Sequence, residues 1–186
     1  MSPLSPRKRR LSGGLRALLI AATLLLTQTA TAGEIGKDKK FGIGVEFAYG
    51  PGLSLKFNPS PGHALQFGLY AFDYGQYRAY SAAHNRYYYG YATGYSGFLA
   101  HADYLNTFGA LVRSGLFDLP WYWGAGLDLG LGAGSAAFAV HGNLGVAMQF
   151  KPLPLDVFLE WTPRLWVIDF VQFHPIDFNA GLRVWF

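Results

Sequence analysis

Alternation of apolar and polar residues is the strongest pattern in this chain. In residues 176–186, the two alternating rows are Ile176, Phe178, Ala180, Leu182, Val184, Phe186 and Asp177, Asn179, Gly181, Arg183, Trp185. Successive side chains of a β-strand point to opposite faces, so this segment predicts a strand with one apolar and one polar face. Its length suits a tilted strand that crosses a bilayer, which needs about 9–11 residues.

The same alternation recurs along the chain and predicts seven further strands. Their approximate ranges are residues 41–49, 53–58, 65–71, 98–104, 121–131, 140–150 and 157–165. A total of eight antiparallel strands is an even number and fits the smallest usual membrane barrel. We therefore predict an all-β fold, an eight-stranded antiparallel up-and-down transmembrane β-barrel that occupies residues 41–186. Closure is expected because an open sheet edge has no hydrogen-bonding partner in lipid.

The segments between these strands predict turns and loops on alternating sides. The expected inner connections are residues 59–62, 106–120 and 151–154, and the outer ones are 50–52, 75–97, 132–137 and 169–175. Segment 106–120 is long for an inner turn. Pro163 falls within a predicted strand, where a bulge would accommodate it.

The first 32 residues differ from the rest of the chain and predict a signal peptide. A basic head is followed by an apolar run from Ala17 to Leu26 and by Ala30-Thr31-Ala32. This order is typical of a secretory signal, and the apolar run is too short for a transmembrane helix. We expect cleavage after Ala32, a short periplasmic segment at residues 33–40, and then the barrel.

Charge and composition favour a membrane barrel over a nucleic-acid-binding or disulfide-rich protein. Five of the 15 Lys and Arg residues lie in the predicted signal, which leaves ten against 11 Asp and Glu and removes electrostatic support for nucleic-acid binding. The chain has no Cys, which excludes disulfides and thiolate metal sites. Charged residues make up only 14% of the chain, against about 25% in a typical soluble domain.

The last strand also carries a resemblance. Residues 178–186, with alternating apolar positions that end in Phe186, resemble the C-terminal signature of outer-membrane proteins. Together with the signal peptide and the strand pattern, the chain resembles small barrels of the OmpA and OmpX type. The resemblance implies outer-membrane localisation, contact with outer-membrane lipid and lipopolysaccharide, and recognition of Phe186 as an assembly signal by the barrel-assembly machinery.

The polar rows place charged side chains inside the predicted barrel. An eight-stranded barrel is just wide enough for side chains to fill it, and charges removed from water need partners. We expect a network of ion pairs that locks the barrel, and the alternative is a gated or proton-sensitive pore. The residues of this predicted network are Glu46, Lys56, His101, Asp103, Asp128, His141, Glu160, Arg164, Asp177 and Arg183.

Candidate chemistry is otherwise scarce. The five histidines (His63, His84, His101, His141 and His174) are scattered, with no pair at ligand spacing, so no metal site is expected. The stretch Val140-His141-Gly142-Asn143 is the nearest approach to the active-site motif of barrel lipid A deacylases, but it lacks the serine. No nucleophile and base can be paired, so we expect neither an enzyme nor a cofactor.

The predicted outer loop at residues 75–97 is rich in tyrosine. Tyrosine offers a large amphipathic surface and is favoured in binding loops. The loop is interpreted either as strands that continue past the membrane, with tyrosines in the aromatic girdle, or as a hairpin that binds an unknown surface ligand. The candidate contact residues are Tyr77, Tyr80, Tyr87, Tyr88, Tyr89 and Tyr91.

These observations predict an outer-membrane protein with a structural or surface-interaction role. A narrow channel for small solutes or ions is the first alternative. A soluble periplasmic lipocalin-like barrel is the second, and it would reverse the faces, because a lipocalin binds apolar ligands inside and is polar outside.

Overall fold

The computed structural model describes residues 34–186, except for residues 49, 75–76, 82–85, 91–94, 133–134 and 168–170. For Ser135 and for those residues within 72–96 that are described, only the backbone is described. The predicted signal peptide lies outside the described residues. None of the described residues forms a helix that is long and apolar enough to span a membrane.

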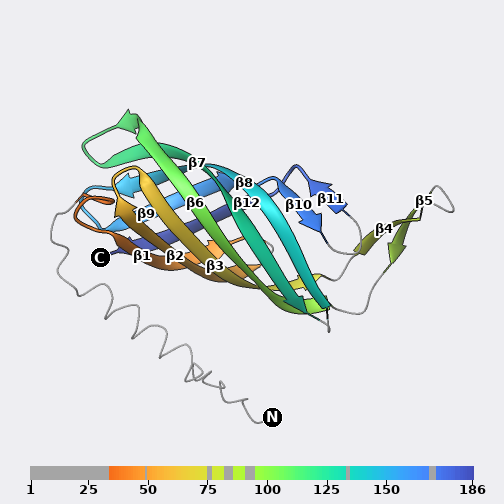
Figure 1. The fold of residues 1–186 in the computed structure, drawn as a ribbon. Coiled ribbons are helices and arrows are strands. Elements are labelled where there is room, and N and C mark those ends of the chain that lie inside the picture. Colours follow the sequence, from red (N-terminus) through yellow and green to blue (C-terminus); the bar gives the residue numbers. More distant parts are fainter. Residues whose placement is uncertain are drawn as a thin grey trace, which may run out of the picture. The chain divides into compact units, whose positions relative to one another are not determined.

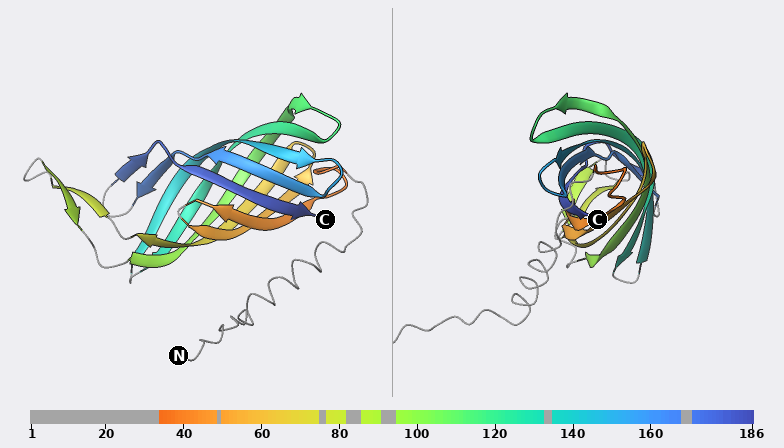
Figure 2. Two further views of the ribbon diagram at one scale, coloured as in Figure 1. Left: turned by 180° about the vertical axis from the view of Figure 1, so that it is seen from behind. Right: turned by 90° about the vertical axis from the view of Figure 1, so that its left-hand side faces the viewer.

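The described chain forms a sheet that closes on itself (Figure 1; Figure 2, right). Its strands are β1 (Phe41–Phe47), β2 (Pro51–Ser60), β3 (His63–Tyr74), β6 (Tyr95–Arg113), β7 (Phe117–Gly132), β8 (Ser135–Phe150), β9 (Leu155–Trp161), β10 (Arg164–Val167), β11 (Val171–His174) and β12 (Phe178–Trp185). Each is antiparallel to its neighbours, and β1 pairs with β12 to close the barrel. Strands β9 and β10 follow each other along one position of the barrel, and both pair with β8. Strands β11 and β12 follow each other along the next position, where they pair with β10 and β9. The ten strands therefore occupy eight positions, and the predicted eight-stranded up-and-down barrel is confirmed.

Pro163 interrupts one of these strands without changing its register to β8. Leu144 pairs with Trp161 below the interruption and His141 pairs with Arg164 above it, so no residue is added on either strand. On the other side, three residues (175–177) lie opposite Thr162 and Pro163, between the pairs Phe178–Trp161 and His174–Arg164. The sequence predicts a bulge at Pro163. The extra residue of the irregularity lies instead on the neighbouring strand, between β11 and β12, opposite the proline, which has no N–H to donate.

Several predicted connections are shorter in the structure. The segment 106–120 was expected to be a turn, which is wrong: β6 continues to Arg113 and β7 begins at Phe117. Likewise, residues 132–137 belong largely to β7 and β8, and residues 171–174 form β11. Turns do occur at residues 61–62 and 151–154 as expected, and Gly62 has a φ of 81°, a conformation that suits glycine.

The two faces of the barrel differ in polarity. Outward-facing large apolar residues are exposed on every strand position, for example Phe67 (44%), Leu129 (47%) and Leu159 (52%). The inward-facing positions that alternate with them include many buried polar and charged side chains, such as Gln66, Asp128 and Glu160. The apolar face is thus on the outside, the reverse of a soluble barrel.

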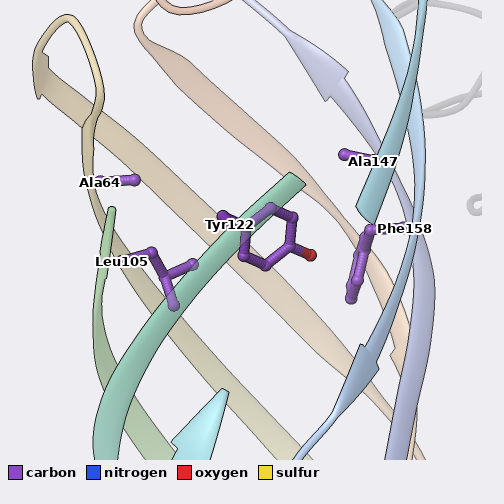
Figure 3. Packing of buried hydrophobic residues seen from close by; sticks show 5 residues of the cluster. All are labelled: Ala64, Leu105, Tyr122, Ala147 and Phe158. Carbon is purple, nitrogen blue, oxygen red and sulfur yellow. The ribbon is translucent and has the colours of Figure 1, made fainter. Parts of the chain in front are cut away.

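Two apolar layers also cross the interior. In one of them, Tyr122 of β7 points between Leu105 and Phe158, with Ala64 and Ala147 nearby (Figure 3). The other consists of Tyr70, Leu99, Ala139 and Trp166. Large buried side chains, rather than a continuous opening, therefore fill much of the interior.

Candidate functional site

The ten polar residues expected inside the barrel all lie in the described part of the chain. Nine of them are buried, with at most 5% exposure, and the side chain of Asp177 is 14% exposed. Their contacts divide them between two groups. The histidine cluster comprises Glu46, His101, Asp103, Asp128, His141, Arg164 and Asp177, and the arginine cluster comprises Lys56, Gln66, Tyr122, Asp156, Glu160 and Arg183.

In the histidine cluster, acidic and basic side chains alternate along a chain of contacts. His101 Nε2 lies 2.9 Å from Glu46 Oε1, and His101 Nδ1 lies 2.7 Å from Asp103 Oδ2. The other oxygen of Asp103, Oδ1, lies 2.6 Å from His141 Nε2. His141 Nδ1 lies 2.7 Å from Asp128 Oδ2. Each imidazole is therefore held between two carboxylates.

Strand pairing explains why these residues meet. Asp103 of β6 pairs with Gly126 of β7, and Gly126 pairs with His141 of β8, so the three positions form one row across three strands. Gly126 has no side chain, and a Cβ atom there would overlap Asp103 Oδ1 and lie 2.6 Å from His141 Nε2. The absence of this Cβ lets Asp103 and His141 touch across the middle strand.

Gly68 has the same role on the other side of the cluster. It pairs with His101 across β3 and β6, and a Cβ atom at Gly68 would overlap both Glu46 Oε1 and His101 Nε2. The contact between Glu46 and His101 therefore passes over this glycine. Two inward-facing glycines thus make room for two contacts between an imidazole and a carboxylate.

The contacts also determine how many protons the cluster needs. Carboxylate oxygens only accept hydrogen bonds, whereas a neutral imidazole donates from only one of its nitrogens. Both nitrogens of His101 and both of His141 face carboxylate oxygens. In the absence of another cation, each ring therefore needs a second proton, carried by the ring itself or by a carboxyl group in contact with it.

Arg164 continues this chain of contacts from Asp128 to Tyr70 and Asp177. Its Nε donates to Asp128 Oδ2 at 3.1 Å, and its Nη2 donates to the Tyr70 hydroxyl at 3.3 Å. Its Nη1 lies 3.5 Å from Asp177 Oδ2. The guanidinium thus links three different strand positions, namely those of β3, β7 and the residues just before β12.

The arginine cluster is centred on a two-point contact between Arg183 and Asp156. Arg183 Nε lies 3.1 Å from Asp156 Oδ1, and Nη2 lies 3.3 Å from Oδ2. Arg183 Nη1 also donates to Gln66 Oε1 at 2.6 Å. Such a planar guanidinium–carboxylate pair is stronger and more directional than a lysine pair.

Glu160 accepts hydrogen bonds from two members of this cluster, Gln66 and Tyr122. Gln66 Nε2 donates to Glu160 Oε1 at 2.9 Å, and the Tyr122 hydroxyl donates to the same oxygen at 2.9 Å. Aromatic faces cover the cations: Lys56 Nζ lies 4.3 Å from the Tyr122 ring centre, and the Arg183 guanidinium lies 3.9 Å from that of Phe158. These contacts supply part of the attraction that buried cations lose with water.

Asp156, Gln66, Tyr122 and Tyr70 are network members that the sequence interpretation did not name. Asp156 is an even number of residues from Glu160 and Arg164, so the two-residue period of a strand places it on the same inward face. It was not named because the predicted strand began one residue later, at Val157. The other three belong to the inward rows, yet nothing in a single strand shows which cross-barrel partner they meet.

Two further predictions from the sequence concern the tyrosine-rich loop at residues 75–97 and the terminal Phe186. The loop segments Tyr77–Ser81 (β4) and Arg86–Gly90 (β5) form a separate antiparallel hairpin. The side chains of its tyrosines, and Tyr91 altogether, lie outside the described residues. Phe186 exchanges backbone hydrogen bonds with Phe41, at 2.8 and 3.3 Å, and thus extends the pairing that closes the barrel.

The segment before β1 folds as a short turn. Lys37 Nζ contacts Glu34 Oε2 at 2.8 Å, and this hydrogen bond raises the pKa of Lys37 above its usual value. Ile35 and Lys39 form a bridge, and Gly36 between them has a φ of 90°. These contacts join residues that are close together in the chain, and the segment adds no residue to either polar cluster.

The interpretation of the histidines as scattered is wrong for His101 and His141. Ligand atoms of His101, Asp103 and His141 all lie within 4.8 Å of one another in the buried interior. These two histidines are 40 positions apart in the chain, and only the pairing of β6, β7 and β8 brings them together.

Comparison with known proteins yields no relative: no family model, curated protein or solved structure matches this chain.

Proposed function

We propose that this chain is a small integral outer-membrane β-barrel protein of the OmpA and OmpX type, exported by a cleaved signal peptide, with a structural or surface-interaction role. The observation that carries the proposal is the exposed apolar exterior of the closed barrel. Large patches of this kind are rare on soluble monomers, where they mark contact with a partner or a membrane.

The exterior has the composition that lipid contact requires. Along β7, the residues Trp123, Leu127, Leu129 and Leu131 are 47–52% exposed, and the buried residues between them include Asp128. A strand with an apolar outer row and a polar inner row is the typical pattern of a membrane barrel. The closed backbone pairing would satisfy the hydrogen-bonding groups that lipid cannot.

The interior argues against the two alternatives. A lipocalin-like barrel binds apolar ligands in an apolar cavity, whereas buried ion pairs such as Arg183–Asp156 and Arg164–Asp128 lie in this interior. A channel needs a continuous water-filled path, whereas buried Trp185, Phe158 and Tyr70 occupy the lumen. A rigid membrane scaffold agrees better with both observations.

Other parts of the proposal rest on the sequence. The pattern that ends in Phe186 supports recognition by the barrel-assembly machinery, and the apolar exterior supports contact with outer-membrane lipid and lipopolysaccharide. The hairpin formed by β4 and β5 lies between the paired ends of β3 and β6, where it would be available for an unknown surface ligand.

A site-directed labelling experiment tests the membrane assignment. Because the chain has no cysteine, a nitroxide can be attached to a single introduced one. In the refolded barrel in lipid vesicles, a label at L129C should collide with dissolved oxygen and be shielded from a water-soluble nickel complex. A label at G115C, in the turn between β6 and β7, should show the reverse. Equal access of the nickel complex to both labels would contradict the proposal.

Heat modifiability provides an independent measurement. Membrane barrels refolded in detergent remain folded in unheated gel samples, so the wild-type chain should change its mobility on boiling. The bacterial fraction that contains the mature protein should be the outer membrane. Recovery in the soluble periplasmic fraction, with no mobility change, would favour the lipocalin-like alternative.

A further inference from the structure

We propose that the histidine cluster is a binding site for one divalent transition-metal ion of the Zn²⁺ class, with His101 Nδ1, His141 Nε2 and the Asp103 carboxylate as ligands. This inference goes beyond the proposed membrane role and does not depend on it, since it rests only on the interior of the barrel.

The first observation is the convergence of the three ligands. The Asp103 carboxylate lies between the two imidazoles, 2.7 Å from His101 Nδ1 and 2.6 Å from His141 Nε2. Two imidazoles and a carboxylate are a common protein ligand set for zinc. Metal–ligand bonds of about 2 Å would place the ligand atoms of a tetrahedral site about 3.3 Å apart, so these contacts would open by less than about 1 Å.

The second observation concerns the opposite nitrogens of the same rings. His101 Nε2 contacts Glu46 and His141 Nδ1 contacts Asp128, at 2.9 and 2.7 Å. Metal-binding histidines commonly donate their other N–H to a carboxylate, which fixes the tautomer and orients the ring. Here both rings have such a partner, and in each case the nitrogen left over faces Asp103.

The charges of the cluster also favour a cation. Glu46, Asp103 and Asp128 surround two imidazoles that have no permanent charge, and Arg164, which contacts Asp128 and Asp177, is the permanent cation that the cluster contains. The four carboxylates of the cluster, Asp177 included, exceed the charge of Arg164 by three, and a divalent ion would offset two of these charges. It would also remove the need for two additional protons on the imidazole–carboxylate contacts.

Two buried oxygens remain available near the site. Glu46 Oε2 and Asp128 Oδ1 have no hydrogen-bond partner among the described residues. A buried oxygen without a partner is costly, and here the two oxygens belong to the carboxylates that orient the histidines. They could accept hydrogen bonds from a water molecule bound to the ion.

The donor types indicate which ions would bind. Imidazole nitrogen suits Zn²⁺, Co²⁺, Ni²⁺ and Cu²⁺, whereas Ca²⁺ and Mg²⁺ prefer sites made only of oxygen. We therefore expect Zn²⁺ to compete with Co²⁺, and Mg²⁺ to have no effect.

Titration of the metal-free barrel with Co²⁺ tests the proposal. The full mature chain, refolded in detergent with a chelator and then dialysed, should bind one Co²⁺ per chain, with the visible d–d bands of a four-coordinate site. Zn²⁺ should remove these bands, and X-ray absorption of the Zn²⁺ form should show two imidazole ligands. A wild-type barrel that is folded but binds no Co²⁺ or Zn²⁺ would overturn the proposal, as would a bound ion without imidazole ligands.

Variants locate the ion within the molecule. H141Q should lose the Co²⁺ bands, and E46Q, which retains all three ligands, should bind about 10–100-fold more weakly. H63Q is the matched control, because His63 is exposed and contacts only the Tyr104 hydroxyl and ring among its described side-chain contacts. It should bind like wild type. A folded H141Q variant with unchanged affinity would also overturn the proposal, and if H141Q does not fold, the wild-type absorption data decide.

Discussion

Asp103 and His141 touch across Gly126: their side chains, on β6 and β8, approach to 2.6 Å over the strand β7 that separates their backbones. This contact requires that the residue of β7 between them has no side chain, because a Cβ atom at Gly126 would overlap Asp103 Oδ1. The polar interior of this barrel therefore depends on the positions of its glycines as much as on those of its charges.

Substitution G126A tests this dependence directly. The new Cβ would overlap Asp103 Oδ1 and press on His141, so either the strands or the ion-pair network must shift. Breaking a buried charged contact costs about 3–5 kcal/mol, and we expect the free energy of unfolding to fall by about this amount. Urea unfolding of the refolded barrel, followed by tryptophan fluorescence, measures the change.

Gly130, on the same strand, provides the matched control for G126A. It also faces inward, but the atoms nearest to an added Cβ lie 3.5 Å away, an ordinary contact distance. G130A should therefore change the stability by less than about 1 kcal/mol. Equal losses in the two variants would show that the strand tolerates no added methyl group and that the network is not the cause.

Removal of Asp156 should destabilise the barrel through Arg183. In D156A, the buried guanidinium loses its two-point partner and keeps only Gln66 among its described hydrogen bonds. An unfolding free energy lower by about 3–5 kcal/mol is expected. The comparison is K151A, because the partly exposed pair Lys151–Asp118 at 3.0 Å should contribute at most about 1 kcal/mol. A loss in D156A no larger than in K151A would mean that Arg183 finds another partner.

A charge on the apolar exterior distinguishes a membrane barrel from a soluble one. Leu129 faces outward on β7, three residues before the end of this strand at Gly132, and L129R should lower the stability in lipid vesicles by about 2–4 kcal/mol if this part of the strand lies near the bilayer centre. L116R, in the turn between β6 and β7, should cost about 0–1 kcal/mol. In a soluble barrel, neither arginine would be unfavourable, so a stable and more soluble L129R variant would contradict the membrane assignment.

The tyrosine-rich hairpin should be dispensable for the barrel. Strands β3 and β6 pair with each other from His63–Asn106 to Tyr74–Tyr95, whereas β4 and β5 pair only with each other. Replacement of residues 77–90 by a short glycine and serine linker should leave heat modifiability unchanged. Any binding to cell surfaces or glycans should be lost. Surviving binding would exclude the hairpin as the contact site, and a loss of heat modifiability would assign it a role in folding.

The sequence predicted the strands best where apolar and polar residues alternate without interruption. Predicted and observed ranges agree within a few residues for β1, β3 and β12, all of which have continuous apolar outer rows. The predicted turn at 106–120 is wrong, although this segment contains Gly109, Gly115 and Pro120, residue types that are frequent in turns. There β6 and β7 remain paired through two register shifts, which disturb the alternation.

Alternation by itself determined which side chains face the interior, because the two-residue period of a strand is a local property of the backbone. It therefore predicted that His101, Asp103, His141 and Arg183 share an inner surface. Only the tertiary structure decided which of them touch. Contacts such as His101–Glu46, 55 residues apart, depend on the register between strands and on closure of the sheet, and both are set by the whole barrel rather than by any one segment.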